Sequence, residues 1–352
     1  MARSESAAHL MADPLLEIRN LKVSFRTDDG VVRAVDGVSL ALEEGETLGI
    51  VGESGSGKSV TAMTVMRLIT DPNAEFEGEV RYKGTDLMSL PQDRIRSIRG
   101  AGIGMIFQDP MTSLNPVYKV GWQIEEQIRE HEKVSKQAAR DRTIELLTAV
   151  GIPNASERVD AYPHEFSGGM RQRVMIAMAI SCNPDVLIAD EPTTALDVTI
   201  QAQILNLIRK LKKDFGTAVV LITHDMGVVA DMADRIVVMY AGRIVEEGSQ
   251  RDLFYDPQHP YTWGLLGSIA RLDRPRPRRL AAIPGQPPSL LALPAGCAFG
   301  DRCQHRFDRC SERPELLDRR GNGHLDACHL TVQQKHDRRD QTIHPELVEE
   351  AP

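Results

Sequence analysis

The chain has 352 residues, of which 41% are hydrophobic and 26% charged, and its formal net charge is −8. This composition is typical of a globular protein with one large domain or two smaller ones. The acidic balance excludes a globally basic nucleic-acid-binding protein, and no apolar run approaches the roughly 18 residues that a membrane-spanning helix needs. Residues 1–14 lack the basic and apolar regions of a signal peptide, so we expect a flexible tail there and a cytosolic chain.

The first predicted elements are short β-like runs with turns over residues 15–51, including a hairpin turn at 27–30. A compact apolar strand is expected at 47–51. It leads into a glycine-rich loop and then a helix at about 59–68. Together these segments predict a strand–loop–helix unit.

Residues 109–165 look mainly helical, with Ser135 as a plausible N-cap and Gly151 as a plausible C-cap. Two further strands are expected at 185–189 and 218–222, separated by a helix. Both strands are apolar throughout, which is typical of a parallel sheet that helices cover on both faces.

The amino-acid composition changes after about residue 260, where arginine and proline become frequent and four cysteines follow. We therefore predict a first domain over 15–262 and a separate extension with little regular structure over 263–333. The charged end of the chain, 334–352, predicts a disordered tail.

A phosphate-binding loop is the most specific motif of the chain. It follows the pattern G-x-x-x-x-G-K-S/T between a strand and a helix, which lets main-chain N–H groups and the helix N-terminus face phosphates. Lys58 is expected to reach the β- and γ-phosphates of ATP, and the Ser59 hydroxyl to bind Mg²⁺. The predicted ATP-binding residues are Gly52, Glu53, Ser54, Gly55, Ser56, Gly57, Lys58, Ser59 and Val60.

Two acidic residues follow the apolar strand at 186–189. Asp190 is placed to hold Mg²⁺, directly or through water, and Glu191 to act as general base on an attacking water. Hydrolysis of a γ-phosphate depends mostly on positioning and charge neutralisation, so these few groups suffice.

The segment Phe166–Arg173 resembles the signature motif of ABC ATPases, with Phe for the usual Leu and Met for the usual Gln. The resemblance implies an α/β fold, a P-loop NTPase of the ABC type with a β-subdomain, a helical subdomain at about 109–165 and a small cysteine-containing C-terminal extension. In this family the motif closes on the ATP held by the opposite subunit. The residues in that role are Ser167, Gly168, Gly169, Met170, Arg171 and Gln172.

The same resemblance implies roles for four further residues. Gln108 looks like the Q-loop glutamine that contacts metal and water, and Asp197 like the D-loop aspartate that communicates across the dimer. His224 looks like the switch histidine at the γ-phosphate. Phe25 sits where the family places an aromatic side chain on adenine.

Longer segments resemble the ATPases of oligopeptide/dipeptide importers, namely 107–116, 162–173, 189–197, 259–262 and 283–288. This resemblance implies ATP hydrolysis that powers peptide import, on the cytoplasmic side of the cell membrane. The implied partners are two permease subunits, a second related ATPase and, indirectly, an extracytoplasmic peptide-binding protein, with no nucleic acid. Nickel importers share much of this pattern and remain an alternative. A soluble ABC ATPase of DNA repair or translation is weaker, because the sequence has neither a long coiled coil nor a second phosphate loop.

The chain has five cysteines. Cys182 stands alone and predicts a buried structural thiol. The spacing of the other four leaves zinc and an iron–sulfur cluster open as ligands. The family resemblance implies a 4Fe-4S cluster, with zinc as the alternative, at Cys297, Cys303, Cys310 and Cys328.

Overall fold

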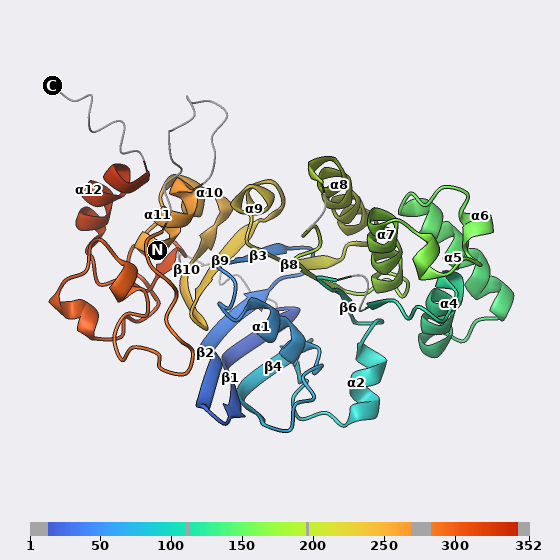
Figure 1. The fold of residues 1–352 in the computed structure, drawn as a ribbon, viewed down its shortest axis with the longest axis horizontal. Helices are drawn as coiled ribbons and strands as arrows, with labels where there is room; N and C mark the ends of the chain where they lie inside the picture. Colours follow the sequence, from blue (N-terminus) through green and yellow to red (C-terminus); the bar gives the residue numbers. More distant parts are fainter. Residues whose placement is uncertain (1–12, 110–112, 195–196, 269–282, 344–352) are drawn as a thin grey trace, which may run out of the picture.

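The computed structural model describes residues 13–109, 113–194, 197–268 and 283–343, which form two sheets with helices around them (Figure 1). The smaller sheet consists of β1 (Leu16–Thr27), β2 (Gly30–Leu42), β4 (Ala74–Tyr82) and β5 (Thr85–Asp86). The larger sheet consists of β3 (Thr47–Val51), β6 (Ile103–Ile106), β7 (Val186–Asp190), β8 (Ala218–Thr223), β9 (Arg235–Tyr240), β10 (Arg243–Ser249), β11 (Leu317–Asp318) and β12 (Leu325–Asp326). The α-helices are α1 (Lys58–Val65), α2 (Gln92–Ile98), α4 (Val120–His131), α5 (Lys136–Ala149), α6 (Ala155–Arg158), α7 (Gly168–Ala179), α8 (Val198–Phe215), α9 (Met226–Met232), α10 (Gln250–Tyr255), α11 (Pro260–Gly267) and α12 (Val332–Ile343). Three 3₁₀ turns are η1 (Pro163–Glu165), η2 (Gly300–Arg302) and η3 (Asp308–Ser311).

The centre of the larger sheet is parallel, in the order β9-β3-β8-β7-β6. Every residue of β3, β7 and β8 is buried, which explains why these strands read as unbroken apolar runs. Helices α8 and α9 lie on one face, and α1 with the smaller sheet lies on the other (Figure 1). The predicted parallel sheet with both faces covered is confirmed.

Residues close together in the sequence also determine where several strands and helices begin or end. β1 and β2 form the predicted hairpin, with Thr27 opposite Gly30. Helix α1 ends earlier than the sequence predicts, because Arg67 adopts a left-handed conformation with φ 48°. Ser135 caps α5 by accepting a hydrogen bond from Ala138 N at 3.1 Å.

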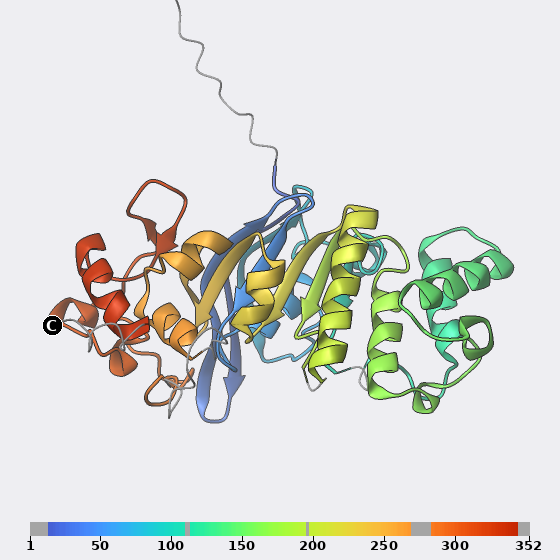
Figure 2. The same cartoon turned by 90° about the horizontal axis from the view of Figure 1, so that it is seen from above.

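Helices α4, α5, α6 and α7 form an arm at one end of the molecule, and the C-terminal extension lies at the other end (Figure 2). Of these helices, α7 contacts both α4 and α5 as well as β6. The arm is therefore joined to the end of the sheet where the strands β6 and β7 lie.

The C-terminal extension, which the sequence predicts over 263–333, contributes the short strands β11 and β12 to the larger sheet. β12 pairs antiparallel with β10, with Glu246 opposite Asp326, so the extension continues the ATPase sheet. The prediction of disorder from residue 334 is wrong for 334–343, where α12 packs against α11. Lys335 anchors this helix: its amino group lies 2.6 Å from Asp326 Oδ1, and both side chains are buried. A charged composition alone could not reveal such a partner.

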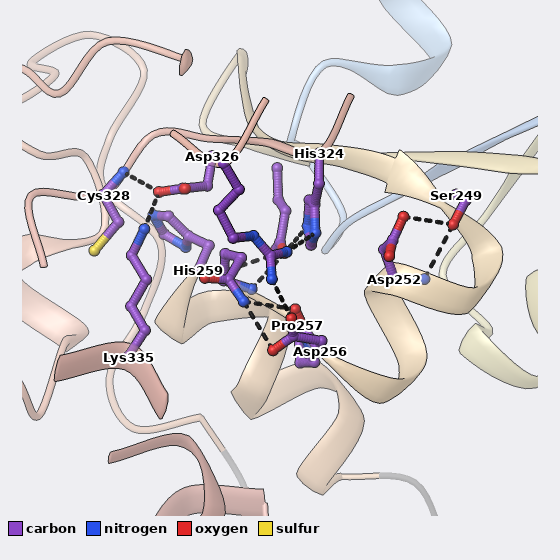
Figure 3. A network of polar contacts seen from close by, with 12 residues as sticks. Ser249, Asp252, Asp256, Pro257, His259, His324, Asp326, Cys328 and Lys335 are labelled. Atoms are coloured by element: carbon purple, nitrogen blue, oxygen red, sulfur yellow. Dashed lines mark hydrogen bonds and ion pairs between the residues drawn. The ribbon is translucent and has the colours of Figure 1, made fainter. Parts of the chain in front are cut away.

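A buried polar network joins the extension to β10 and α11 (Figure 3). His324 Nε2 and Glu246 Oε1 are 2.7 Å apart, with neither side chain exposed. Arg320 Nη2 lies 2.7 Å from His324 Nδ1. Because a guanidinium can only donate, Nδ1 accepts and Nε2 carries the proton that is donated to Glu246.

Candidate ATP-binding and hydrolysis site

The phosphate loop links β3 to α1, and its backbone requires glycine at two positions. Gly52 has φ 154°, and a Cβ atom there would lie 2.2 Å from Met239 O. Gly57 has φ 98°, and its Cβ would lie 2.5 Å from Ala34 O. The glycines therefore let the loop pass close to neighbouring main chain, as the motif predicts.

Lys58 is folded over this loop. Its Nζ donates to the main-chain oxygens of Gly52 at 2.8 Å and Glu53 at 2.9 Å, and lies 3.4 Å from Ser56 Oγ. Burial lowers the pKa of Lys58, while the nearby carboxylates, Glu191 foremost, act in the opposite direction. Phosphate oxygens are stronger acceptors than these neutral groups, so a triphosphate at the loop can draw this ammonium group to itself.

Ser59 and Asp190, two of the residues predicted to bind Mg²⁺, are joined by a hydrogen bond. Asp190 is buried at the end of β7, and its Oδ1 accepts a hydrogen bond from Ser59 Oγ at 3.0 Å. Burial raises the pKa of Asp190, and the Ser59 hydrogen bond opposes this rise. Hydroxyl and carboxylate oxygens of this kind are suitable ligands for Mg²⁺.

The three predicted catalytic residues also come together. Glu191 Oε2 accepts from Gln108 Nε2 at 3.2 Å, and Glu191 Oε1 lies 3.4 Å from His224 Nδ1. Gln108, Glu191 and His224 follow the carboxyl ends of β6, β7 and β8, the edge where open parallel sheets bind ligands.

Glu191 itself is held in an unusual backbone conformation. Its φ is 46°, its main-chain N–H donates to Ile222 O at 2.9 Å, and Thr194 Oγ1 donates to Glu191 Oε2 at 2.8 Å. A non-glycine residue in the left-handed region persists only where its surroundings fix it, and such residues cluster at functional sites.

The signature segment begins α7. Ser167 is the N-cap, and its hydroxyl accepts a hydrogen bond from Met170 N at 3.4 Å. Ser167 and Gly168 are exposed, and a Cβ on Gly168 would meet nothing within 4 Å, so this helix end is open. Arg171 and Gln172 point elsewhere in the same chain: Arg171 Nε donates to Pro163 O at 2.8 Å, and Gln172 Nε2 to Pro192 O at 2.6 Å.

Three further predicted residues are placed without a tested role. Phe25, on β1, and Val60, on α1, are half-buried against the core between the two sheets. Asp197 caps α8 by accepting from Ile200 N at 3.0 Å. The remaining D-loop residues 195–196, and 110–112 beside Gln108, lie outside the described residues.

The four clustered cysteines line one pocket in the extension and have free thiols. Burial raises the pKa of Cys303 to about 11 and that of Cys328 to about 12. Within the described ranges, no group of three or more His, Cys, Asp or Glu side chains is placed to hold a metal ion. The iron–sulfur assignment therefore stays a prediction. Cys182 is buried, as predicted for a structural thiol.

Sequence reasoning missed two residues that contact the phosphate loop from the C-terminal side. Glu53 N donates to Tyr261 Oη at 2.8 Å, and the Glu53 carboxylate pairs with Arg302 at 2.6 and 3.0 Å. A carboxylate inside an anion-binding loop is a signal that a cationic partner is needed, although the sequence does not say which one.

Fold and site together define an ATPase of the ABC class. The ABC transporter family model matches residues 35–194, and the model "Oligopeptide/dipeptide transporter, C-terminal region" matches residues 245–310. The dimeric ATP-binding cassette MJ0796, in a post-hydrolysis state with ADP and Pi, has a TM-score of 0.61 at 30% identity, covering 67% of this chain and 99% of that one.

Named relatives narrow the class further. The oligopeptide transport ATP-binding protein OppD of Bacillus subtilis is 57% identical over 292 residues, 83% of this chain and 82% of that protein. The dipeptide transport ATP-binding protein DppD of Bacillus subtilis is 52% identical over 322 residues, 91% and 96% respectively. The chain belongs to the family of ATP-binding subunits of oligopeptide/dipeptide ABC transporters. The predicted family, fold class and ATPase class are thus confirmed. Among the described residues, no helix combines the length and apolar character needed to cross a membrane.

Proposed function

We propose that this chain hydrolyses ATP to power the import of dipeptides or oligopeptides, as one of two nucleotide-binding subunits of an ABC importer. The observation that carries the proposal is the meeting of Asp190, Glu191, Gln108 and His224 beside the phosphate loop, in a chain of this family. Peptide is favoured over nickel as cargo because relatives that are 51–57% identical to this chain are named for oligopeptide and dipeptide transport.

In the proposed reaction, the phosphate loop and Lys58 bind the β- and γ-phosphates of ATP. Ser59, Asp190 and Gln108 would hold Mg²⁺, which neutralises charge on the phosphates when bound. Glu191 orients a water molecule and takes its proton, and His224 contacts the γ-phosphate. The hydrogen bonds of Glu191 to Gln108 and Thr194 support this assignment, because they fix the carboxylate that must accept the proton.

The second half of each ATP site comes from another subunit in this proposal. Ser167 to Gln172 close on the ATP of a related ATPase chain, and Asp197 communicates across the contact. The open N-terminus of α7 supports this role, because helix N-termini bind phosphate. The related cassette MJ0796 is a dimer, which supports pairing of this kind.

Membrane attachment is proposed to be indirect. The chain docks on two permease subunits at the cytoplasmic side of the cell membrane, and an extracytoplasmic protein delivers the peptide to them. The family relationship supports these partners.

We further propose that Cys297, Cys303, Cys310 and Cys328 hold a 4Fe-4S cluster, with a structural role in the extension. Their shared pocket and their thiol donors support this assignment. Iron and labile sulfide analysis after anaerobic purification tests it, with four irons and four sulfides per chain expected from the proposed cluster. Stoichiometric zinc without labile sulfide would overturn it.

The proposed function is tested by purifying the chain with its associated membrane proteins and measuring ATP hydrolysis. Two permeases and a second ATPase should co-purify, and peptide with its binding protein should stimulate hydrolysis. Co-purification with ribosomes or DNA in place of permeases would contradict the proposal.

A further inference from the structure

The C-terminal extension reaches into the phosphate loop through one residue, Arg302. Its guanidinium faces the Glu53 carboxylate in a forked pair, with Nη1–Oε2 at 2.6 Å and Nη2–Oε1 at 3.0 Å. The Arg302 side chain is only 6% exposed and that of Glu53 is 29% exposed. Two parallel charge-assisted hydrogen bonds between side chains that are largely removed from solvent are stronger and more directional than a surface ion pair.

The remaining contacts of Arg302 fix its position. Its Nε donates to Pro284 O at 2.8 Å, and Nη1 lies 3.3 Å from Tyr240 Oη. The guanidinium carbon lies 5.7 Å from the centre of the Tyr240 ring and 5.9 Å from that of Phe299. Arg302 is therefore held from several sides, and cannot leave Glu53 without breaking other contacts.

Glu53 is held on its main chain as well. Its N–H donates to the hydroxyl of Tyr261, which is buried on α11 and packs with Tyr240 at a ring distance of 4.6 Å. Glu53, the second residue of the phosphate-loop motif, is thus fixed at both its carboxylate and its N–H by the C-terminal part of the chain.

The ion pair between Arg302 and Glu53 affects the electrostatic potential at the site where ATP binds. Burial lowers the pKa of Lys58, and the Glu53 carboxylate is near enough to oppose that lowering, together with Glu191 and Asp190. An unpaired carboxylate within the same loop also repels the triphosphate that Lys58 binds. Arg302 neutralises this charge and leaves the loop free to accept an anion.

We propose that Arg302 is a positioning residue for ATP binding, which neutralises and orients Glu53 of the phosphate loop from the cysteine-containing extension. Arg302 ends the turn η2 and directly precedes Cys303, and the main chain of this segment is fixed by Gly300 N to Cys297 O at 2.9 Å. The conformation of the segment between Cys297 and Cys303 therefore sets the position of the guanidinium. The extension acts on the nucleotide site through this contact.

The test measures the dissociation constant of Mg-ATP for the full-length chain by isothermal titration calorimetry, with melting temperatures as a check on folding. Arg302→Met should weaken binding roughly tenfold, because it leaves Glu53 unpaired. Arg302→Met combined with Glu53→Gln removes both charges and should bind Mg-ATP at least about threefold more tightly than Arg302→Met alone. Arg306→Met, in the same extension but paired with Asp301 at the surface, should bind like wild type.

Two results would overturn the proposal: wild-type affinity in Arg302→Met, or a double variant as weak as Arg302→Met. The second result would mean that Arg302 only stabilises the structure of the extension. A purely structural role gives no reason for Glu53→Gln to restore ATP affinity. If Arg302→Met does not fold, Arg302→Gln carries the test, because it removes the positive charge and keeps a polar side chain beside Glu53. Its affinity should then fall at least threefold, and wild-type affinity would contradict us.

The inference rests on the proposed binding of ATP at this loop. The same calorimetric measurement distinguishes failure of the proposed function from failure of the role proposed for Arg302. Failure of the wild-type chain to bind Mg-ATP would refute the proposed function itself. Wild-type binding that Lys58→Ala abolishes and Arg302→Met leaves intact would refute only the role of Arg302.

Discussion

Glu191 offers the sharpest test of the hydrolysis site, because Glu191→Gln changes one group and little else. Glutamine has the same length, and its carbonyl oxygen can still accept the hydrogen bond that Thr194 Oγ1 now donates at 2.8 Å. The left-handed main chain at residue 191 is held by the bond to Ile222 O and does not depend on the carboxylate. We therefore expect a folded variant with an intact loop.

The expected loss of turnover follows from the proton that glutamine cannot accept. A positioned general base contributes about 10²- to 10⁴-fold to a rate, and each factor of ten corresponds to about 1.4 kcal/mol of activation free energy. The variant should thus lose roughly 3–5 kcal/mol of transition-state stabilisation. Binding should be preserved or tightened, because removal of the Glu191 charge leaves the site less repulsive to phosphate.

Two measurements on the assembled complex decide this prediction: steady-state release of phosphate, and the dissociation constant of Mg-ATP. Glu145→Gln is the matched control, since Glu145 is an exposed residue of α5 in the helical arm. Turnover of Glu191→Gln within about threefold of wild type would remove Glu191 from the role of base. Loss of binding along with turnover would show that the substitution disturbs the site and would refute the geometric reasoning.

Three further substitutions test other parts of the account. Lys58→Ala should lose Mg-ATP binding by calorimetry with the melting temperature unchanged, because the loop loses its ammonium group; unchanged affinity would contradict this. Gly52→Ala should lose both nucleotide binding and stability, since its Cβ would meet a main-chain oxygen at 2.2 Å, and a wild-type melting temperature would argue against that contact. His324→Ala should lower the free energy of unfolding by roughly 2–4 kcal/mol in urea titrations, because it leaves the buried Glu246 short of a donor. The exposed His336→Ala should change it by less than about 0.5 kcal/mol, and equal effects of the two would refute the buried network.

The parts of the fold that the sequence could predict are those fixed by neighbours along the chain. Ser167 caps α7 through a donor three residues away, and the turn at Thr27–Gly30 closes on itself. The apolar run of β3 directly precedes the loop that it presents. Part of the candidate site was predictable for the same reason, since Asp190 ends β7 and Glu191 follows it, whereas the roles of Gln108 and His224 came from the family resemblance.

What the sequence could not show depends on contacts between distant residues. Arg302 and Glu53 are separated by 249 positions, and neither position alone indicates the other. β12 has two residues, too few for a periodic pattern, and exists because β10 offers an edge to pair with. The helix α12 is charged in its middle part, and its order depends on the ion pair between Lys335 and the buried Asp326.

The central claim is that ATP hydrolysis at this site moves peptide, and the most direct test is reconstitution. The chain is reconstituted in vesicles with the proposed partner ATPase and the two proposed permeases, and ATP is supplied on the side of the membrane where the ATPases lie. We predict that peptide with its binding protein on the opposite side stimulates phosphate release and that labelled peptide accumulates, both lost in Glu191→Gln. Hydrolysis that peptide does not stimulate, or that nickel stimulates in its place, would contradict the account.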